Sequence, residues 1–171
     1  VRTLFSNLNS AQSNNFNCSY IRKDGRLIWE INALGTIVRL NGPVVTTNKW
    51  QHVALVKNGP RFTMFLNGKD VASTNATVAV SPGRNKFTIG ALLTNSGIYF
   101  PFRGEMDEFR VWSVSRTVDQ IRDYMCKKVP VSSLMTGLSS YYRFDTGNNS
   151  TITSDLGVGV NGILNNILFS D

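Results

Sequence analysis

The sequence predicts an all-β protein built as a two-sheet antiparallel β-sandwich with one short helix. Of its 171 residues, 42% are hydrophobic and only 17% are charged, while Asn, Ser, Thr and Gly fill the gaps between apolar runs. That balance suits short strands joined by turns better than helices. Turn signals recur along the chain, and only one segment carries a helical pattern. Many short strands with frequent turns indicate a sandwich.

The first predicted element is a hairpin near the N-terminus. Its strands are Cys18–Arg22 and Arg26–Ile31, and the turn between them is Lys23-Asp24-Gly25. A turn with Asp-Gly between two strand-forming runs is a strong hairpin signal. The segment TIVRLN, from Thr36, is a further short strand.

The clearest stretch, KWQHVALVKNGPRFTMFLNGKDVAST, predicts three antiparallel strands in a meander. The strands are Trp50–Val56, Arg61–Leu66 and Lys69–Ser73. Asn58-Gly59-Pro60 forms the first turn, and Asn67-Gly68 forms the second.

The second half of the chain adds strands around one helix. NKFTIGA and FRGEMDEFRVW are expected as strands on either side of a loop, Leu92–Pro101. LSSYYRFD is another strand, followed by a polar loop over 146–162 and an apolar run, Ile163–Phe169. These segments are as short as the earlier ones and continue the same pattern.

The helix is expected near residues 117–127. Thr117 and Gln120 form a capping box, and Lys127 and Lys128 suit its C-terminal end. Helical spacing relates the apolar residues Ile121, Tyr124 and Met125. This short helix is expected to lie against the rim of a sheet.

Several motifs, in order, resemble one family. WQHVALVKNGPRFTMFLNGKDVAS, FTIGA, FRGEMDEFRVWSVSRTVDQIRDYM and LSSYYRFDTGNNSTITSDLGVGVNGIL resemble laminin-G-like, or pentraxin-like, domains of the concanavalin A-like lectin/glucanase superfamily. The resemblance covers roughly residues 50–164 and implies a jelly-roll sandwich. The helix ending RxxMC is similar to copies of this domain in large secreted bacterial surface proteins. The resemblance therefore implies a secreted or cell-surface protein.

The predicted domain spans 1–171 as one laminin-G-like sandwich. Members of the family usually open with a strand segment just before the region corresponding to RTLFSN, and that segment is absent here. Residues 138–171 resemble the motif that opens such a domain. Either these C-terminal strands complete the sandwich, or the chain is a piece of a longer repeat-bearing protein. A missing interior strand would leave backbone N–H and C=O groups of its neighbours unpaired. A strand from one of these two sources is therefore required to complete the sheet.

Two cysteines, Cys18 and Cys126, are far apart in sequence. With a single histidine and no CxxC, they form no zinc cluster of the Cys/His type. In an exported protein we expect them to pair in a disulfide that stabilises the fold by roughly 3–5 kcal/mol. Two free buried thiols are the alternative.

The densest carboxylate cluster is Glu105, Asp107 and Glu108. In a strand Glu105, Asp107 and Phe109 share one face. Some glucanases of this superfamily carry an E-x-D-x-E strand, and a retaining mechanism needs two carboxyls ~5–5.5 Å apart. Phe109 stands at the third position, so the acid/base partner is missing. The protein is therefore not expected to be an enzyme, and a glycoside hydrolase is disfavoured.

The family resemblance implies a structural Ca²⁺ on the rim or convex face of the sandwich. Asp107 is a candidate ligand, and Asp145 and Asp155 are candidates in the loops that follow. Ca²⁺ requires six to eight oxygen ligands, which carboxylates and loop carbonyls provide. The alternative is that these aspartates accept hydrogen bonds from turn amides.

Ligand contacts are expected from the aromatic residues of the long loop, Tyr99, Phe100 and Phe102. Loops carry function on such scaffolds, and aromatic rings suit the C–H faces of sugars. Local packing is the alternative for all three. The tryptophans Trp29, Trp50 and Trp112 lie in strand patterns, where core packing is the commoner outcome.

The net charge limits the classes of binding partner that the sequence supports. The chain carries 18 basic and 11 acidic residues, a net charge of +7. This is either a solvated surface or an attraction for an acidic polysaccharide. The basic residues are scattered and no nucleic-acid motif appears, so nucleic acid is not expected. No run approaches the ~20 apolar residues of a membrane span.

The sequence therefore predicts a non-catalytic recognition or adhesion module. It is expected to bind carbohydrate or an extracellular surface protein through rim loops. The alternative from another class is a structural spacer or repeat within a large surface protein.

Overall fold

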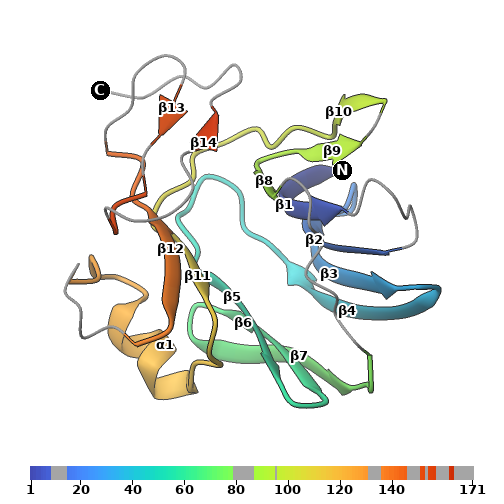
Figure 1. Cartoon of the computed structure of the whole chain (residues 1–171), viewed down its shortest axis with the longest axis horizontal. Coiled ribbons are helices and arrows are strands. Elements are labelled where there is room, and N and C mark those ends of the chain that lie inside the picture. The colour runs from blue at the N-terminus through green and yellow to red at the C-terminus, as the bar shows by residue number, and fades with distance from the viewer. Residues whose placement is uncertain are drawn as a thin grey trace. The chain divides into compact units, whose positions relative to one another are not determined.

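The structure is a computed structural model that describes residues 1–8, 15–78, 87–94, 96–130, 136–145, 151–152, 154–156 and 162–163. The chain divides into two compact units, Val1–Arg103 and Gly104–Asp171. Their elements are labelled in Figure 1. Each unit is described by itself.

A five-stranded antiparallel sheet forms one layer of the first unit. The strands lie in the order β4-β3-β2-β1-β8. The predicted N-terminal hairpin is confirmed as β2 and β3, while the first strand of the chain was not expected. The sheet consists of β1 (Arg2–Leu8), β2 (Asn15–Ile21), β3 (Arg26–Ala33), β4 (Thr36–Val44) and β8 (Phe87–Ile89).

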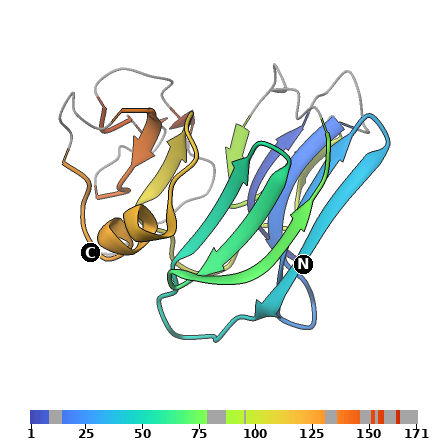
Figure 2. The same cartoon turned by 90° about the horizontal axis from the view of Figure 1, so that it is seen from below.

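The second layer is the predicted meander. Its strands are β5 (Val53–Asn58), β6 (Arg61–Leu66) and β7 (Lys69–Asn75), paired in the order β5-β6-β7. Figure 2 shows this sheet facing the larger one. A small hairpin, β9 (Leu92–Thr94) and β10 (Gly97–Tyr99), lies where the sequence predicted an irregular loop.

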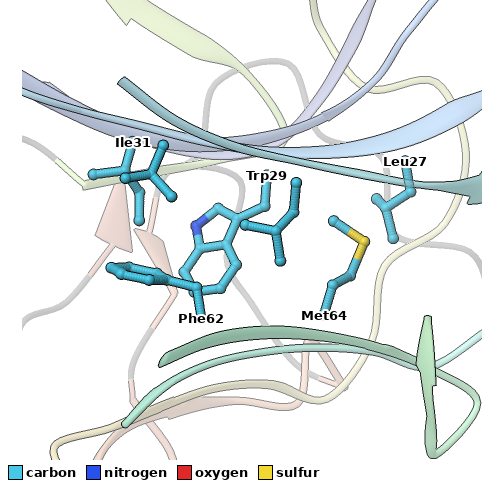
Figure 3. Close-up of a cluster of buried hydrophobic side chains, with 7 residues drawn as sticks. Leu27, Trp29, Ile31, Phe62 and Met64 are labelled. Carbon is cyan, nitrogen blue, oxygen red and sulfur yellow. The ribbon is translucent and has the colours of Figure 1, made fainter. Parts of the chain in front are cut away.

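The core lies between the two sheets, as a sandwich requires. Trp29 of β3 meets Phe62 of β6, with ring centroids 5.5 Å apart. Figure 3 shows the side chains of β3 and β6 pointing toward one another. Alternate residues of each strand point into this space because successive side chains leave a strand on opposite faces. The buried cluster is Leu27, Trp29, Ile31, Val38, Leu40, Phe62 and Met64.

Trp50 is not a core residue. The predicted strand over 50–56 begins only at Val53, and the side chain of Trp50 is 66% exposed. Side-chain hydrogen bonds hold the preceding segment out of the sheet. The side-chain amide of Gln51 donates to the Thr46 backbone carbonyl over 2.7 Å. The backbone amide of His52 donates to the side-chain Oδ1 of Asn67 over 2.9 Å. These local bonds replace the ladder that the apolar pattern suggested.

In the second unit, β11 (Phe109–Trp112) pairs with β12 (Leu138–Tyr142), and β13 (Thr151–Ile152) pairs with β14 (Gly162–Ile163). The helix α1 spans Val118–Tyr124, inside the predicted range. Both halves of the capping box between Thr117 and Gln120 are present, which confirms the predicted start.

The strand expected over 102–112 is shortened to β11. Residues 103–108 take no strand conformation, and Glu108 has a positive φ of 55°. That angle is uncommon for a residue with a side chain, and it breaks the strand alternation. The predicted face shared by Glu105, Asp107 and Phe109 is therefore wrong.

The domain prediction over 1–171, and completion of the sandwich by 138–171, stay predictions. Most of 146–162 and of Ile163–Phe169 lies outside the described residues. Within the described part of the chain, no helix is long and apolar enough to cross a lipid bilayer.

Candidate binding surface

The outward face of the five-stranded sheet carries a row of polar residues. Cys18 of β2 lies opposite Glu30 of β3, which in turn lies opposite Arg39 of β4. Trp29 and Ile31, on either side of Glu30, point into the core. Alternation along the strand therefore directs Glu30 and its cross-strand neighbours away from the core.

Glu30 is buried even though it lies on the outward face, with a relative exposure of 8%. Its Oε2 accepts hydrogen bonds from Arg39 Nε over 2.6 Å and from the Tyr20 hydroxyl over 3.0 Å. A buried carboxylate is costly unless it is paired and hydrogen-bonded in this way. The three side chains therefore form one fixed cluster, which we call the Glu30 cluster: Tyr20, Glu30 and Arg39.

The cluster shifts the titration of its neighbours. Burial, followed by the hydrogen bond to Glu30, raises the pKa of Tyr20 to about 12. Burial, followed by the negative charge of Glu30, also raises the pKa of the Cys18 thiol to about 12. The hydrogen bond to Glu30 and the charge of that carboxylate raise the pKa of Arg39. Arg39 stays charged, and Tyr20 and Cys18 stay neutral, over the physiological pH range.

The β9–β10 hairpin presents the predicted aromatic residues. Tyr99 and Phe100 are 43% and 47% exposed, and their ring centroids are 6.3 Å apart at 48°. Phe102 is only half-buried and follows them along the chain. The structure thus places two of the three predicted contact residues, Tyr99 and Phe100, openly on the surface as an adjacent pair.

Backbone hydrogen bonds fix this aromatic segment. The Thr3 amide donates to the Phe100 carbonyl over 3.0 Å, and the Phe102 amide donates to the Gly90 carbonyl over 2.7 Å. Phe100 has a positive φ of 49°. Such a strained backbone persists only where surrounding contacts determine it, and it is often found at ligand-contacting positions.

The aromatic pair and the Glu30 cluster belong to the same side of the sheet. Thr3, which is bonded to Phe100, lies opposite Tyr20 in the β1–β2 register. The Ser6 hydroxyl, in the same row as Cys18, donates to the Ala91 carbonyl over 2.9 Å. Figure 1 shows β9 and β10 beside β1. The hairpin therefore borders the outward face at its β1 edge.

The Glu30 cluster was missed in the sequence, although a signal for it exists. Leu34 and Gly35 have positive φ angles and form the turn between β3 and β4. Glu30 and Arg39 lie at equal distances on either side of that turn, so a hairpin places them opposite each other. An acid and an arginine so placed predict a cross-strand ion pair.

Charge is distributed unequally between the two units. Residues 1–103 contain twelve basic and three acidic residues, a net charge of +9, whereas residues 104–171 contain six basic and eight acidic residues, a net charge of −2. All three acids of the first unit are paired with arginine: Asp24 with Arg22 and Arg26, Glu30 with Arg39, and Asp70 with Arg61. The remaining cations of the first unit create a positive field.

The aspartates predicted to bind calcium lie in the second unit and have other partners. Asp107 accepts a hydrogen bond from the Glu108 amide over 2.8 Å. Asp145 pairs with Lys128 over 2.6 Å, and Asp155 accepts from Arg143 Nε over 2.7 Å. Two of the three carboxylates, those of Asp145 and Asp155, are thus paired with a basic side chain. The described residues contain no group of three His, Cys, Asp or Glu side chains suited to a metal ion.

This donor set does not fit a Ca²⁺ site, which needs six to eight oxygens free of competing cations. Calcium would have to displace Lys128 from Asp145 and Arg143 from Asp155. Calcium binding by Asp107, Asp145 and Asp155 is untested and stays a prediction. The melting temperature with and without EDTA would check it.

The side chain of Glu108 points inward and contacts other side chains of the second unit. Its Oε2 accepts from the Tyr141 hydroxyl over 2.6 Å, and it forms an ion pair with Arg110. Arg110 also donates to the carbonyls of Tyr124 and Lys127, which stabilises the end of α1. Glu105 and Asp107 are exposed, so the predicted carboxylate cluster does not form one site.

The structure does not contain the predicted disulfide. Cys18 and Cys126 are both free thiols, the first buried in β2 and the second exposed after α1. Burial raises the pKa of the Cys18 thiol to about 12, which keeps it protonated in this folded, reduced state.

Comparison with known proteins gives a family match and similar folds. The family model described as the concanavalin A-like lectin/glucanases superfamily, of laminin G type, matches residues 1–122. No protein of curated function matches the chain. The match extends to the N-terminus, beyond the region where the motifs themselves carry the resemblance.

Two solved structures are similar to this chain. One is a Bacteroides ovatus protein to which carbohydrate binding is provisionally attributed, with a TM-score of 0.67 and 25% identity over 95% of this chain. This chain spans only 51% of that protein. The other is an S-layer domain-containing protein from Clostridium thermocellum, with a TM-score of 0.43 and 20% identity over 71% of this chain and 61% of the other. A likeness at that TM-score carries no information on function.

Proposed function

The chain belongs to the concanavalin A-like lectin/glucanase superfamily, and from that premise we propose that it is a non-catalytic module that binds an acidic carbohydrate. The observation that carries the proposal is the exposed Tyr99–Phe100 pair on a backbone held by hydrogen bonds. Aromatic rings of this kind bind the C–H faces of sugars through apolar contact. A platform fixed in advance loses little entropy on binding.

Two further observations support carbohydrate as the ligand class. The Bacteroides ovatus protein to which carbohydrate binding is provisionally attributed shares the fold over 95% of this chain. The net charge of +9 on residues 1–103, with every acid of that unit paired, favours an acidic chain over a neutral one. Such ligands place the module outside the cell, as a secreted or surface protein engaged in recognition or adhesion.

The non-catalytic part of the proposal rests on the carboxylates. In the sequence, Phe109 stands where the E-x-D-x-E pattern has its second glutamate. In the structure Glu108 is engaged by Arg110 and Tyr141, and Glu105 and Asp107 are exposed outside any strand. A retaining hydrolase requires two carboxyls facing one sugar. We therefore expect no hydrolysis of β-glucans by the protein.

The test is a glycan array that contains uronic-acid, sulfated and neutral oligosaccharides. We expect the protein to bind acidic members, and the double variant Tyr99→Ala/Phe100→Ala to lose binding about ten-fold or more. Alanine retains a Cβ, so the backbone of residue 100 keeps the same constraint. Trp50→Ala is the control, because it removes an aromatic ring that is even more exposed, at 66%, from another loop.

Three results would contradict the proposal. An array with no bound glycan would favour a structural spacer. Equal loss in Trp50→Ala would move the site to the loop before β5. Release of sugar from a β-glucan, lost on Glu105→Gln, would make the protein an enzyme.

A further inference from the structure

We propose that Arg39, held by Glu30 on the outward face of β2–β4, binds the carboxylate of a uronic-acid residue in a polysaccharide chain. The inference rests on the proposed function and assigns the group that selects an acidic sugar. It adds a charged contact to the aromatic one on the β9–β10 hairpin, on the same side of the sheet.

Arg39 retains unused hydrogen-bond donors at a fixed position. Its side chain is 51% exposed, and only Nε is engaged, by Glu30 Oε2 at 2.6 Å. Among the described residues no partner is found for its two terminal nitrogens. These nitrogens are paired donors whose planar geometry matches a carboxylate. The ion pair fixes the guanidinium before any ligand arrives, which lowers the entropy cost of binding.

Glu30 supplies the complementary acceptor. Tyr20 and Arg39 both bond to Oε2, and within the described part of the chain no hydrogen bond to Oε1 is found. Oε1 is therefore the acceptor that we assign to a ligand hydroxyl. Donors that suit an anion therefore lie beside an acceptor that suits a hydroxyl. A uronic acid carries a planar carboxylate and hydroxyl groups on one ring. Free sulfate has no hydrogen-bond donor and would leave the acceptor of Glu30 unmatched.

The face around the cluster extends toward the aromatic pair. Asn41 of β4 is exposed on the same face as Arg39, two residues further along the strand. Across the strands, the row that contains Arg39 passes through Glu30 and Cys18 to Ser6 of β1. Strands are ~4.8 Å apart, so β4 and β1 are separated by roughly 14 Å. A single sugar ring cannot reach both ends, whereas an oligosaccharide can.

The structural alternative is that Arg39 serves only to neutralise Glu30. The chain offers a matched control in Arg61 of β6, on the outward face of the other sheet. Arg61 is 54% exposed and lies 3.7 Å from Asp70. It therefore has the same charge, a similar exposure and an acidic partner. It differs from Arg39 in its location and in its pairing, since its partner is exposed and one terminal nitrogen also donates to the Ser73 hydroxyl over 3.1 Å. Its replacement measures the effect of lost net charge away from the proposed site.

The experiment is calorimetric titration of the full chain with oligogalacturonate, and with dextran sulfate and a neutral glucan as comparison ligands. Arg39→Gln is expected to weaken oligogalacturonate binding about ten-fold, the loss of a charge-assisted contact. Arg61→Gln is expected to change it less than about two-fold. Monogalacturonate is expected to bind far more weakly than the oligomer.

Arg39→Gln leaves Glu30 buried without its cation, which destabilises the sheet. A second variant, Arg39→Lys, keeps the charge but loses the paired planar donors. We expect it to melt like the parent protein and still to bind oligogalacturonate more weakly. Thermal melting of each variant separates folding from binding.

Each remaining outcome decides the proposal. If Arg39→Gln and Arg61→Gln weaken binding equally, lost net charge is the cause and Arg39 does not bind the carboxylate. If Tyr99→Ala/Phe100→Ala loses binding and the Arg39 variants do not, the proposed function stands and this inference is wrong. Tighter binding of dextran sulfate than of oligogalacturonate would overturn the choice of a uronic acid. A parent protein that binds no acidic glycan overturns both proposals.

Discussion

At the scale of single residues, the two cysteines occupy opposite environments. Cys18 is 7% exposed, and burial raises the pKa of its thiol to about 12, whereas Cys126 is exposed. Only the thiolate reacts with a maleimide. We therefore expect Cys126 alone to be labelled at pH 7.5 in the native protein, and both cysteines in denaturant. Intact-mass measurement reads the number of labels.

The same experiment tests the disulfide that the sequence predicts. A native protein that takes no label, and takes two only after reduction, would contain the Cys18–Cys126 bond and contradict the free thiols. Cys126→Ser should abolish native labelling while leaving one label in denaturant. That variant assigns the reactive thiol.

Burial of Cys18 also predicts a dependence of stability on alkaline pH. The native state holds the thiol proton up to a pKa of about 12, while the unfolded chain releases it near 9.0. Because the native pKa is raised, this stabilisation is complete below pH 9 and is lost as pH rises toward 12. The free energy of unfolding should fall in that window. Cys18→Ala should flatten the decline, and Tyr20 should maintain part of it.

Tyr141 holds the second unit together through its hydroxyl. The ring is fully buried, the hydroxyl donates to Glu108 over 2.6 Å, and it accepts from the Val129 amide over 3.2 Å. Tyr141→Phe removes both bonds and leaves the buried Val129 amide without this acceptor, while Glu108 keeps Arg110 as its partner. We expect a loss of about 1–3 kcal/mol in urea unfolding. Tyr99→Phe, at an exposed position, is the control, and an equal loss there would contradict this account.

Surface exposure was easier to predict than the partner of a side chain. Tyr99 and Phe100 were candidates for exposed ligand contacts because they lie in a loop, with local packing as the alternative. Both are exposed, and their contact with a ligand stays a prediction. The inward turn of Glu108 could not be predicted, because a positive φ redirects its side chain toward Arg110 and Tyr141. Tyr141 lies on β12 and approaches Glu108 only through the pairing of β11 with β12, which sequence spacing does not reveal.

At the scale of elements, hairpins were predicted more reliably than strand ends. The turns at Gly25, Gly59 and Asn67 have positive φ angles, and the residues that tolerate such angles mark them in the sequence. Strand ends depend instead on competition between ladder bonds and side-chain bonds. The loop before β5 illustrates this, because Gln51 and Asn67 bond to backbone groups that a strand would have used.

The two sheets of the sandwich approach most closely at Gly42 in β4. A Cβ placed there would lie 2.5 Å from Met64 Sδ of β6 and 3.0 Å from the Leu27 carbonyl oxygen. The methionine can move, but the backbone carbonyl cannot move without shifting β3. We expect Gly42→Ala to cost about 1–3 kcal/mol in denaturant unfolding. Asn41→Ala, one residue away and exposed, should be nearly neutral; similar losses in both variants would exclude close packing as the cause.

At the scale of the whole molecule, opposite charges are segregated along the chain. Residues 1–103 carry +9 and residues 104–171 carry −2, a difference that the total of +7 conceals. The two halves also differ in how their acids are used. In the first, every acid neutralises an arginine, so the cations in excess are available to an external anion. The charge therefore argues for a partner and not only for solubility.

This segregation predicts how binding responds to salt. Affinity for oligogalacturonate should fall steadily as NaCl is raised from about 50 to 500 mM, because the Debye length shrinks from roughly 14 Å to below 5 Å. The aromatic contact is apolar and should persist. A neutral glucan, if it binds, should show almost no such dependence. Calorimetric titrations at each salt concentration make the comparison. Equal salt dependence for both ligands, or none for oligogalacturonate, would show that the positive charge of residues 1–103 does not act on the ligand.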